Sequence, residues 1–108
     1  MIRELAPSEL AQWRDDSTRL SPLLVDVREP WEFDVCRIEG SMLVPLGELP
    51  SRLADLPQDR PLVLICHHGG RSYHATAWLQ RNGFADVRNL RGGVAAWAAE
   101  VDPRMRQY

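Results

Sequence analysis

The sequence predicts an α/β fold built on a mostly parallel β-sheet. Short apolar runs recur along the chain, and each is followed by a stretch in which apolar residues are spaced as on one face of a helix. This alternation is typical of parallel strands joined by crossover helices. The 108 residues, of which 44% are hydrophobic, can bury one core of ordinary size. We therefore expect one domain, spanning residues 1–108, with no linker or internal repeat.

Four apolar runs are predicted strands, namely residues 23–27, 42–44, 62–65 and 87–90. A fifth and shorter run, residues 2–5, is a candidate edge strand. The run 62–65 is continuously apolar, which is typical of a central strand covered on both faces. The expected sheet thus has four to five strands, with residues 62–65 near its centre.

Four segments carry apolar residues at steps of three and four, the spacing of one helix face. They are a segment beginning near residues 7–8, residues 46–56, the segment from Cys66 to Asn82, and a segment beginning near residues 92–93. We expect the second helix to stop at Pro57 and the third at Asn82-Gly83, a pair suited to a left-handed C-cap. Three tryptophans fall on apolar helix faces and are predicted core residues, whereas a fourth could shape the rim of a site. The three are Trp13, Trp78 and Trp97, and the fourth is Trp31.

Charge and composition exclude several classes of function. The 13 basic and 15 acidic residues give a net charge of −2 without a long run of one sign, so we expect neither a nucleic-acid nor a membrane partner. Every basic residue is Arg, which removes Lys as a catalytic base or Schiff-base former. Charged residues at the N-terminus do not fit a signal peptide, so we expect a cytoplasmic protein. Its two cysteines, Cys36 and Cys66, should then be free thiols.

The loop after the strand 62–65 carries the chemistry. It reads Cys66-His67-His68-Gly69-Gly70-Arg71-Ser72. Ligands of parallel sheets bind beyond the carboxyl ends of the strands, and Cys66 lies at such an end. The loop leads into a helix N-terminus, whose unpaired N–H groups and dipole favour negative charge. Gly69 and Gly70 let successive N–H groups converge on one anion. Together with Arg71, these groups favour the nucleophilic thiolate form of Cys66.

The alternative is a buried and inert cysteine at a strand end, with Gly69-Gly70 forming only a strand-to-helix turn. For an isolated cysteine we would prefer that interpretation. Here a Cys, two Gly, an Arg and a Ser fall within seven positions after a buried strand, which favours a functional loop.

The loop resembles the active-site loop of rhodanese-family sulfurtransferases, in which four residues separate the catalytic Cys from an Arg that is often followed by Ser. The similarity extends over nearly the whole chain. Residues 26–29 read Asp-Val-Arg-Glu, like the family's early strand end, and Trp31-Glu32-Phe33 follows. Residues 38–46 resemble its Ile-Pro-Gly-Ala stretch, and residues 83–97 resemble its closing strand and Gly-Gly helix. The order and spacing of these motifs are more specific than any motif alone.

This resemblance implies a single rhodanese-like domain with helices on both faces of the sheet, in agreement with the apolar pattern. It also implies sulfur transfer without a cofactor or metal. Cys66 would take sulfane sulfur from a small anionic donor such as thiosulfate and hold it as a persulfide, which a thiol, a protein acceptor or cyanide would then remove. The N–H groups of residues 67–72 would hold the persulfide, and Arg71 would orient loop and donor. Asp26 and Arg28 would support the neighbouring loops.

Two rival functions remain as alternatives. One is a non-catalytic rhodanese-like module that binds a protein, although such modules often lack the cysteine. The other is a phosphatase or arsenate reductase of the same fold, whose loops have five residues between Cys and Arg. This chain has four, and the smaller ring suits a sulfur atom better than a phosphate group.

Neighbouring loop residues such as His67 and His68 usually point apart, and no Cys or His lies at a finger-like spacing, which disfavours a metal site. Two interpretations stay open: one imidazole adds positive charge for an anionic donor near neutral pH, or both are exposed loop residues. His74 is expected to be structural or at the surface. Cys36, where the family often has Gly, is expected to be a buried inert thiol in preference to a resolving thiol.

The tail, residues 101–108, resembles the ending of rhodanese domains fused to enzymes that activate ubiquitin-like sulfur carriers. That resemblance hints at a protein acceptor. The default expectation for eight residues at a chain end is a simple surface tail.

Overall fold

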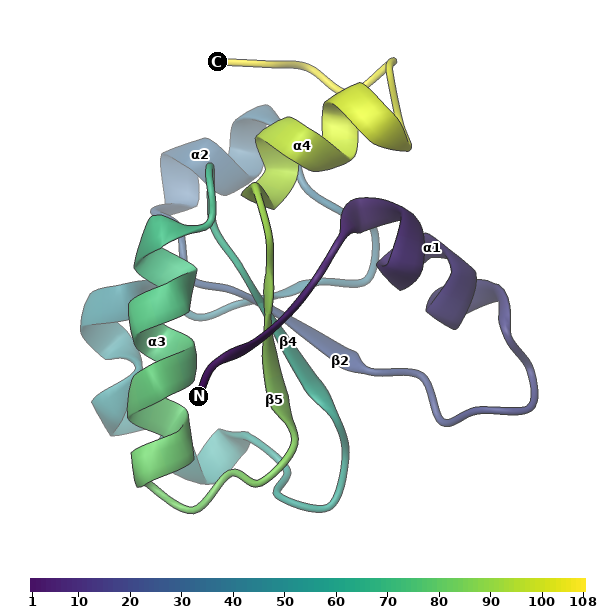
Figure 1. The fold of residues 1–108 in the computed structure, drawn as a ribbon. Helices are drawn as coiled ribbons and strands as arrows, with labels where there is room; N and C mark the ends of the chain where they lie inside the picture. Colours follow the sequence, from purple (N-terminus) through teal and green to yellow (C-terminus); the bar gives the residue numbers. More distant parts are fainter.

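The computed structural model describes all 108 residues and contains one five-stranded sheet (Figure 1). The strands are β1 (Arg3–Leu5), β2 (Leu23–Asp26), β3 (Met42–Leu43), β4 (Leu62–Ile65) and β5 (Val87–Leu90). Their order is β1-β5-β4-β2-β3, and all neighbours are parallel. The predicted α/β fold and the five strands, including the edge strand, are confirmed, and β4 is the central strand.

The register of the sheet brings the ends of three strands to one place. Asp26 at the end of β2 pairs with Ile65, the residue before Cys66. On the other side of β4, Leu64 pairs with Asn89 of β5. Because parallel strands share one carboxyl edge, Asp26, Cys66 and Asn89 meet there.

The α-helices are α1 (Pro7–Asp15), α2 (Pro30–Val35), α3 (Gly70–Arg81) and α4 (Gly93–Glu100). Three of them were predicted, and α3 is followed by Gly83 at φ +95°, as expected for a left-handed C-cap. The helix α2 was not predicted, because six residues are too few to show a period. It begins with proline at its first position, and Glu32 accepts a hydrogen bond from the Glu29 N–H at 3.0 Å.

The single α-helix expected over residues 46–56 is wrong. The segment forms two 3₁₀ helices, η1 (Leu46–Glu48) and η2 (Pro50–Asp55). Pro50 has no N–H to donate to a preceding turn, so it separates the two pieces. The leucine spacing also fits three residues per turn, and Leu49 and Leu56 are buried.

Two apolar clusters cover the two faces of the sheet. On one face α3, η1 and η2 pack on β2, β4 and β5, and on the other face α1 and α4 do so (Figure 1). Trp13 and Trp97 are buried in the second cluster, as predicted. Trp78, also predicted as a core residue, packs against the first cluster but is only half-buried, and it lines a groove of about 370 Å³ beside η1 and η2. No helix has both the length and the apolar character needed to cross a membrane.

Candidate active site

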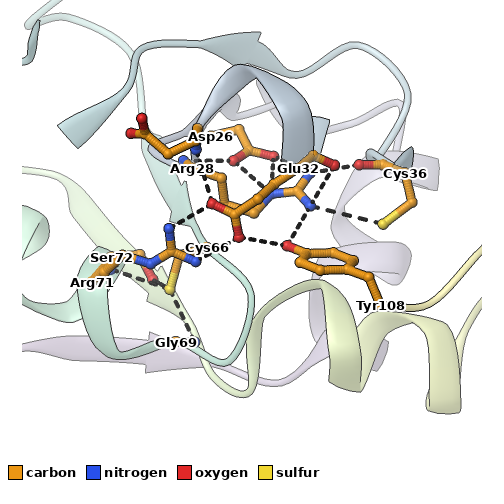
Figure 2. Close-up of polar contacts among 10 residues, drawn as sticks. Asp26, Arg28, Glu32, Cys36, Cys66, Gly69, Arg71, Ser72 and Tyr108 are labelled. Carbon is orange, nitrogen blue, oxygen red and sulfur yellow. Dashed lines mark hydrogen bonds and ion pairs between the residues drawn. The ribbon is translucent and has the colours of Figure 1, made fainter. Parts of the chain in front are cut away.

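Cys66 lies directly after β4 and is 1% exposed. Its Sγ accepts hydrogen bonds from the N–H groups of Gly69, at 3.1 Å, and Ser72, at 3.3 Å. The Ser72 hydroxyl lies 3.2 Å from the same sulfur (Figure 2). Two N–H donors, one from the loop and one from the start of α3, thus converge on the sulfur, while the single hydroxyl proton of Ser72 is directed to Asn89 Oδ1 at 2.5 Å.

Three backbone carbonyl groups of the Cys66 loop accept hydrogen bonds from neighbouring elements. The Cys66 oxygen accepts from the Val94 N–H at 2.9 Å, and the His67 oxygen accepts from the Ala95 N–H at 3.0 Å. Both donors are orphan N–H groups of the first turn of α4. The Gly69 oxygen accepts from the side-chain amide of Asn89 at 3.1 Å. These three contacts hold the backbone of the Cys66 loop in place.

Other N–H groups of the same loop are unpaired. The backbone N–H groups of His68, Gly70 and Arg71 donate to no group of the protein. Because α3 begins at Gly70, two of them also belong to its positive N-terminal end. The structure therefore offers free donors beside those that already bind Cys66 Sγ.

Gly93 allows the start of α4 to lie close to the backbone of the Cys66 loop. Its φ is +62°, in the left-handed region, and a Cβ there would overlap the carbonyl groups of Cys66 and His67. Gly69, with φ +99°, meets the same restriction inside the loop, where a Cβ would lie 3.0 Å from the Gly92 nitrogen. The glycines thus allow two backbones to touch at the site.

Asn89 is a site residue that sequence reasoning missed. Its Oδ1 accepts from the Ser72 hydroxyl at 2.5 Å, and its Nδ2 donates to Gly69 O and to Glu4 Oε2, the latter at 2.8 Å. It is 1% exposed. The available signal was a polar residue inside the apolar run 87–90, since a buried amide requires partners.

Arg71 does not point freely at the site opening. Its guanidinium binds Glu32 through two bonds of 2.7 and 2.8 Å (Figure 2). The hydrogen bond from Arg71 is the main cause that lowers the pKa of Glu32 from 4.5 to about 2, against the opposing effect of burial. Glu32 was noted in the sequence only as part of a motif, because its partner lies 39 residues away.

Asp26 and Arg28 form a fully buried ion pair at 2.8 Å. Arg28 also donates to the carbonyl oxygens of Glu32, at 3.2 Å, and Cys36, at 2.6 Å. Burial opposes the charge of Arg28, but hydrogen bonds with Asp26 and Tyr108 outweigh it and raise its pKa. The pair makes no hydrogen bond with the Cys66 loop itself and instead holds the segment around α2.

His67 and His68 stack on each other with ring centroids 3.9 Å apart. Burial, followed by the charge of His68, lowers the pKa of His67, which disfavours a positive charge on His67 at neutral pH. His68 and His74 are exposed. The structure contains no group of three His, Cys, Asp or Glu side chains that could hold a metal ion.

Two expectations about the rim need correction. Cys36 is not buried but half-exposed, and its Sγ lies 3.8 Å from Arg28 Nη1. The tail is not a plain surface tail, because Tyr108 returns to the site and bonds to both Arg28 and Glu32. Trp31, 60% exposed, packs edge-on against the Tyr108 ring at the rim.

Comparisons with known proteins show the family of the chain. The family model for the rhodanese-like domain matches residues 6–100. The chain is 39% identical over 98 residues to a sulfurtransferase of Allochromatium vinosum, covering 91% of this chain and 90% of that protein. It is 42% identical over 106 residues to the probable adenylyltransferase/sulfurtransferase MoeZ of Mycobacterium tuberculosis, covering 96% of this chain but 26% of that protein. The chain thus spans about a quarter of the length of this relative.

A solved structure shows the same fold. The rhodanese-like domain protein from Staphylococcus aureus matches with a TM-score of 0.83 at 27% identity, covering 93% of this chain and 95% of that chain. The matched family region contains β2, the Cys66 loop and α4, which together form the site. The chain therefore belongs to the rhodanese-like domain family.

Proposed function

We propose that this chain is a rhodanese-type sulfurtransferase that carries sulfane sulfur as a persulfide on Cys66. The observation that carries the proposal is the convergence of two backbone N–H donors, those of Gly69 and Ser72, on Cys66 Sγ. Hydrogen bonds donated to a sulfur stabilise its anionic form. A cysteine in a loop with further free N–H groups can act first as a nucleophile and then as a carrier of an anion.

In the first step the Cys66 thiolate attacks the outer sulfur of a donor such as thiosulfate. A new S–S bond forms to Cys66, the S–S bond of thiosulfate breaks, and sulfite leaves with the electron pair. The charge of the persulfide then resides on the transferred sulfur. The free N–H groups of His68, Gly70 and Arg71 are the donors available to bind it.

In the second step an acceptor thiolate attacks the transferred sulfur, and Cys66 leaves as the thiolate that began the cycle. Cyanide can take the place of the thiolate in an assay. Arg71 serves this cycle through its position, because its paired guanidinium holds the end of the loop against Glu32. A protein thiol acceptor is part of the proposal, since the rim around Trp31 and Tyr108 is open to solvent.

The direct test is the intact mass of the protein after incubation with thiosulfate. We expect a gain of one sulfur atom per chain in the wild type and no gain in Cys66→Ser. Cys36→Ser, which removes the only other thiol, is the matched control and should still gain sulfur. Absence of the adduct in the wild type, or its persistence in Cys66→Ser, would contradict the proposal.

A further inference from the structure

The last residue of the chain joins two ion pairs of the site. The Tyr108 hydroxyl accepts a hydrogen bond from Arg28 Nη1 at 2.9 Å and donates one to Glu32 Oε2 at 2.8 Å (Figure 2). Arg28 is held by the buried Asp26, and Glu32 holds Arg71. One hydroxyl therefore connects the rigid pair at the end of β2 with the pair that fixes the end of the Cys66 loop.

The ring of Tyr108 contacts the loop directly. It stacks on the imidazole of His67 with centroids 3.9 Å apart and planes 15° from parallel. His67 is the neighbour of Cys66 in sequence. The cavity lined by His67, Cys36 and Tyr108 has a volume of only about 10 Å³, so the tail is closely packed on this side of the loop.

We propose that Tyr108 is a positioning residue of the sulfur-transfer site, a role that rests on the proposed function. Its hydroxyl holds Glu32, and through Glu32 it holds Arg71, while its ring holds His67 beside Cys66. The tail thus completes the site from a position 76 residues away from Glu32.

The chemistry of the hydroxyl is suited to this role. Burial is the main cause that raises the pKa of Tyr108 to about 12, so the phenol keeps its proton at neutral pH and can donate to Glu32. Tyr108 is 37% exposed, and Gln107 and Arg106 before it are exposed. Burial of residues 106–108 therefore adds little to the stability of the fold, whereas Val101 and Met105 pack against the core, so the polar and stacking contacts of Tyr108 are the larger part of its connection to the site.

The test compares Tyr108→Phe, which keeps the ring, with Tyr108→Ala, which removes it. Tyr73→Phe is the matched control, because the exposed Tyr73 of α3 makes no hydrogen bond through its hydroxyl. Single-turnover formation of the Cys66 persulfide is measured at saturating thiosulfate and below the unfolding temperature of every variant. We expect a loss of about tenfold for Tyr108→Phe, from the loss of hydrogen bonds to two charged groups.

For Tyr108→Ala we expect a loss of about 10²-fold, the scale of a small misplacement of reacting groups. The donor concentration for half-saturation should change little, because the proposed role of Tyr108 is to hold the loop and not to bind the donor. Tyr73→Phe should match the wild type. If both Tyr108 variants form the persulfide at the wild-type rate, the positioning role is wrong.

Two measurements need no sulfur transfer. The NMR signals of the His67 ring should move in Tyr108→Ala, which loses the stacked ring, and stay nearly unchanged in Tyr108→Phe. The rate at which iodoacetamide alkylates Cys66, located by peptide mass spectrometry, should fall several-fold at neutral pH in Tyr108→Ala. Unchanged His67 signals in Tyr108→Ala would overturn the docking of the tail, and unchanged alkylation would overturn the positioning. If the wild type takes up no sulfur, only the proposed function is contradicted. The His67 signals and the alkylation rate of Cys66 still test whether Tyr108 positions the loop.

Discussion

The Glu32→Gln substitution should lower the stability of the protein by an amount that depends on pH. The fall in the pKa of Glu32 from 4.5 to about 2 corresponds to about 3 kcal/mol of stabilisation at neutral pH. Water screens part of this energy, because the Arg71 side chain is 39% exposed, so we expect a loss of about 2 kcal/mol for the variant. Gln has the same size as Glu and accepts hydrogen bonds, so packing stays nearly constant.

The pH dependence follows from the direction of the shift. A carboxyl whose pKa is lower in the folded state stabilises the fold above its unfolded pKa, and this stabilisation is lost as the pH falls through 4.5 toward 2. At pH 3.5 about two fifths of the contribution should be gone. Wild type and variant should therefore differ less at pH 3.5 than at pH 7.

Urea unfolding at pH 7 and at pH 3.5, followed by tryptophan fluorescence, measures this difference. The other carboxyls titrate in both proteins, so they cancel in the comparison. Glu48→Gln is the control, since the exposed pair of Glu48 with Arg52 should contribute less than about 1 kcal/mol. An equal difference between wild type and Glu32→Gln at the two pH values would refute the reasoning.

Three further outcomes are expected at the loop. Gly93→Ala should destabilise the fold by at least about 3 kcal/mol in thermal or urea unfolding, because the added Cβ would overlap the carbonyl groups of Cys66 and His67. A variant as stable as the wild type would contradict the close approach of α4 to the Cys66 loop. Ser72→Ala should slow persulfide formation by about tenfold, because its hydroxyl contacts Cys66 Sγ at 3.2 Å and ties the start of α3 to Asn89. A mass-spectrometric time course would show the change, and an unchanged rate would remove that hydroxyl from the mechanism. An NMR titration of His67 should give a midpoint below the ordinary 6.5, and a midpoint above 6.5 would restore a cationic role for this side chain.

The sheet and the Cys66 loop were predictable because their signals are local. The apolar run of β4 and the residues that follow it lie next to one another in sequence. The segment 46–56 was misassigned because steps of three and four suit an α-helix and a 3₁₀ helix alike, and only Pro50 favoured the second. The helix α2 was too short for any periodic signal, although Pro30 at its first position was a usable sign.

The contacts that complete the site were not predictable in the same way. Glu32 meets Arg71 across 39 residues, and Tyr108 meets Glu32 across 76. Pairing at such distances depends on tertiary structure: the strand order brings β2 beside β4, and the chain after α4 returns to Arg28 and Glu32. Asn89 could have been identified as a buried amide in an apolar strand, but not as the partner of Ser72.

The contact between α4 and the loop also has a consequence for ligand selectivity. A peptide unit can in principle flip and exchange its oxygen for its N–H, which would turn an anion cradle into a cation ligand. Here the N–H groups of Val94 and Ala95 donate hydrogen bonds to the backbone oxygens of Cys66 and His67. A flip of either peptide would break one of these hydrogen bonds and leave buried polar groups without partners. The orientation of these two peptide groups is therefore fixed. A positively charged molecule that approaches this part of the loop meets amide hydrogens in place of carbonyl oxygens.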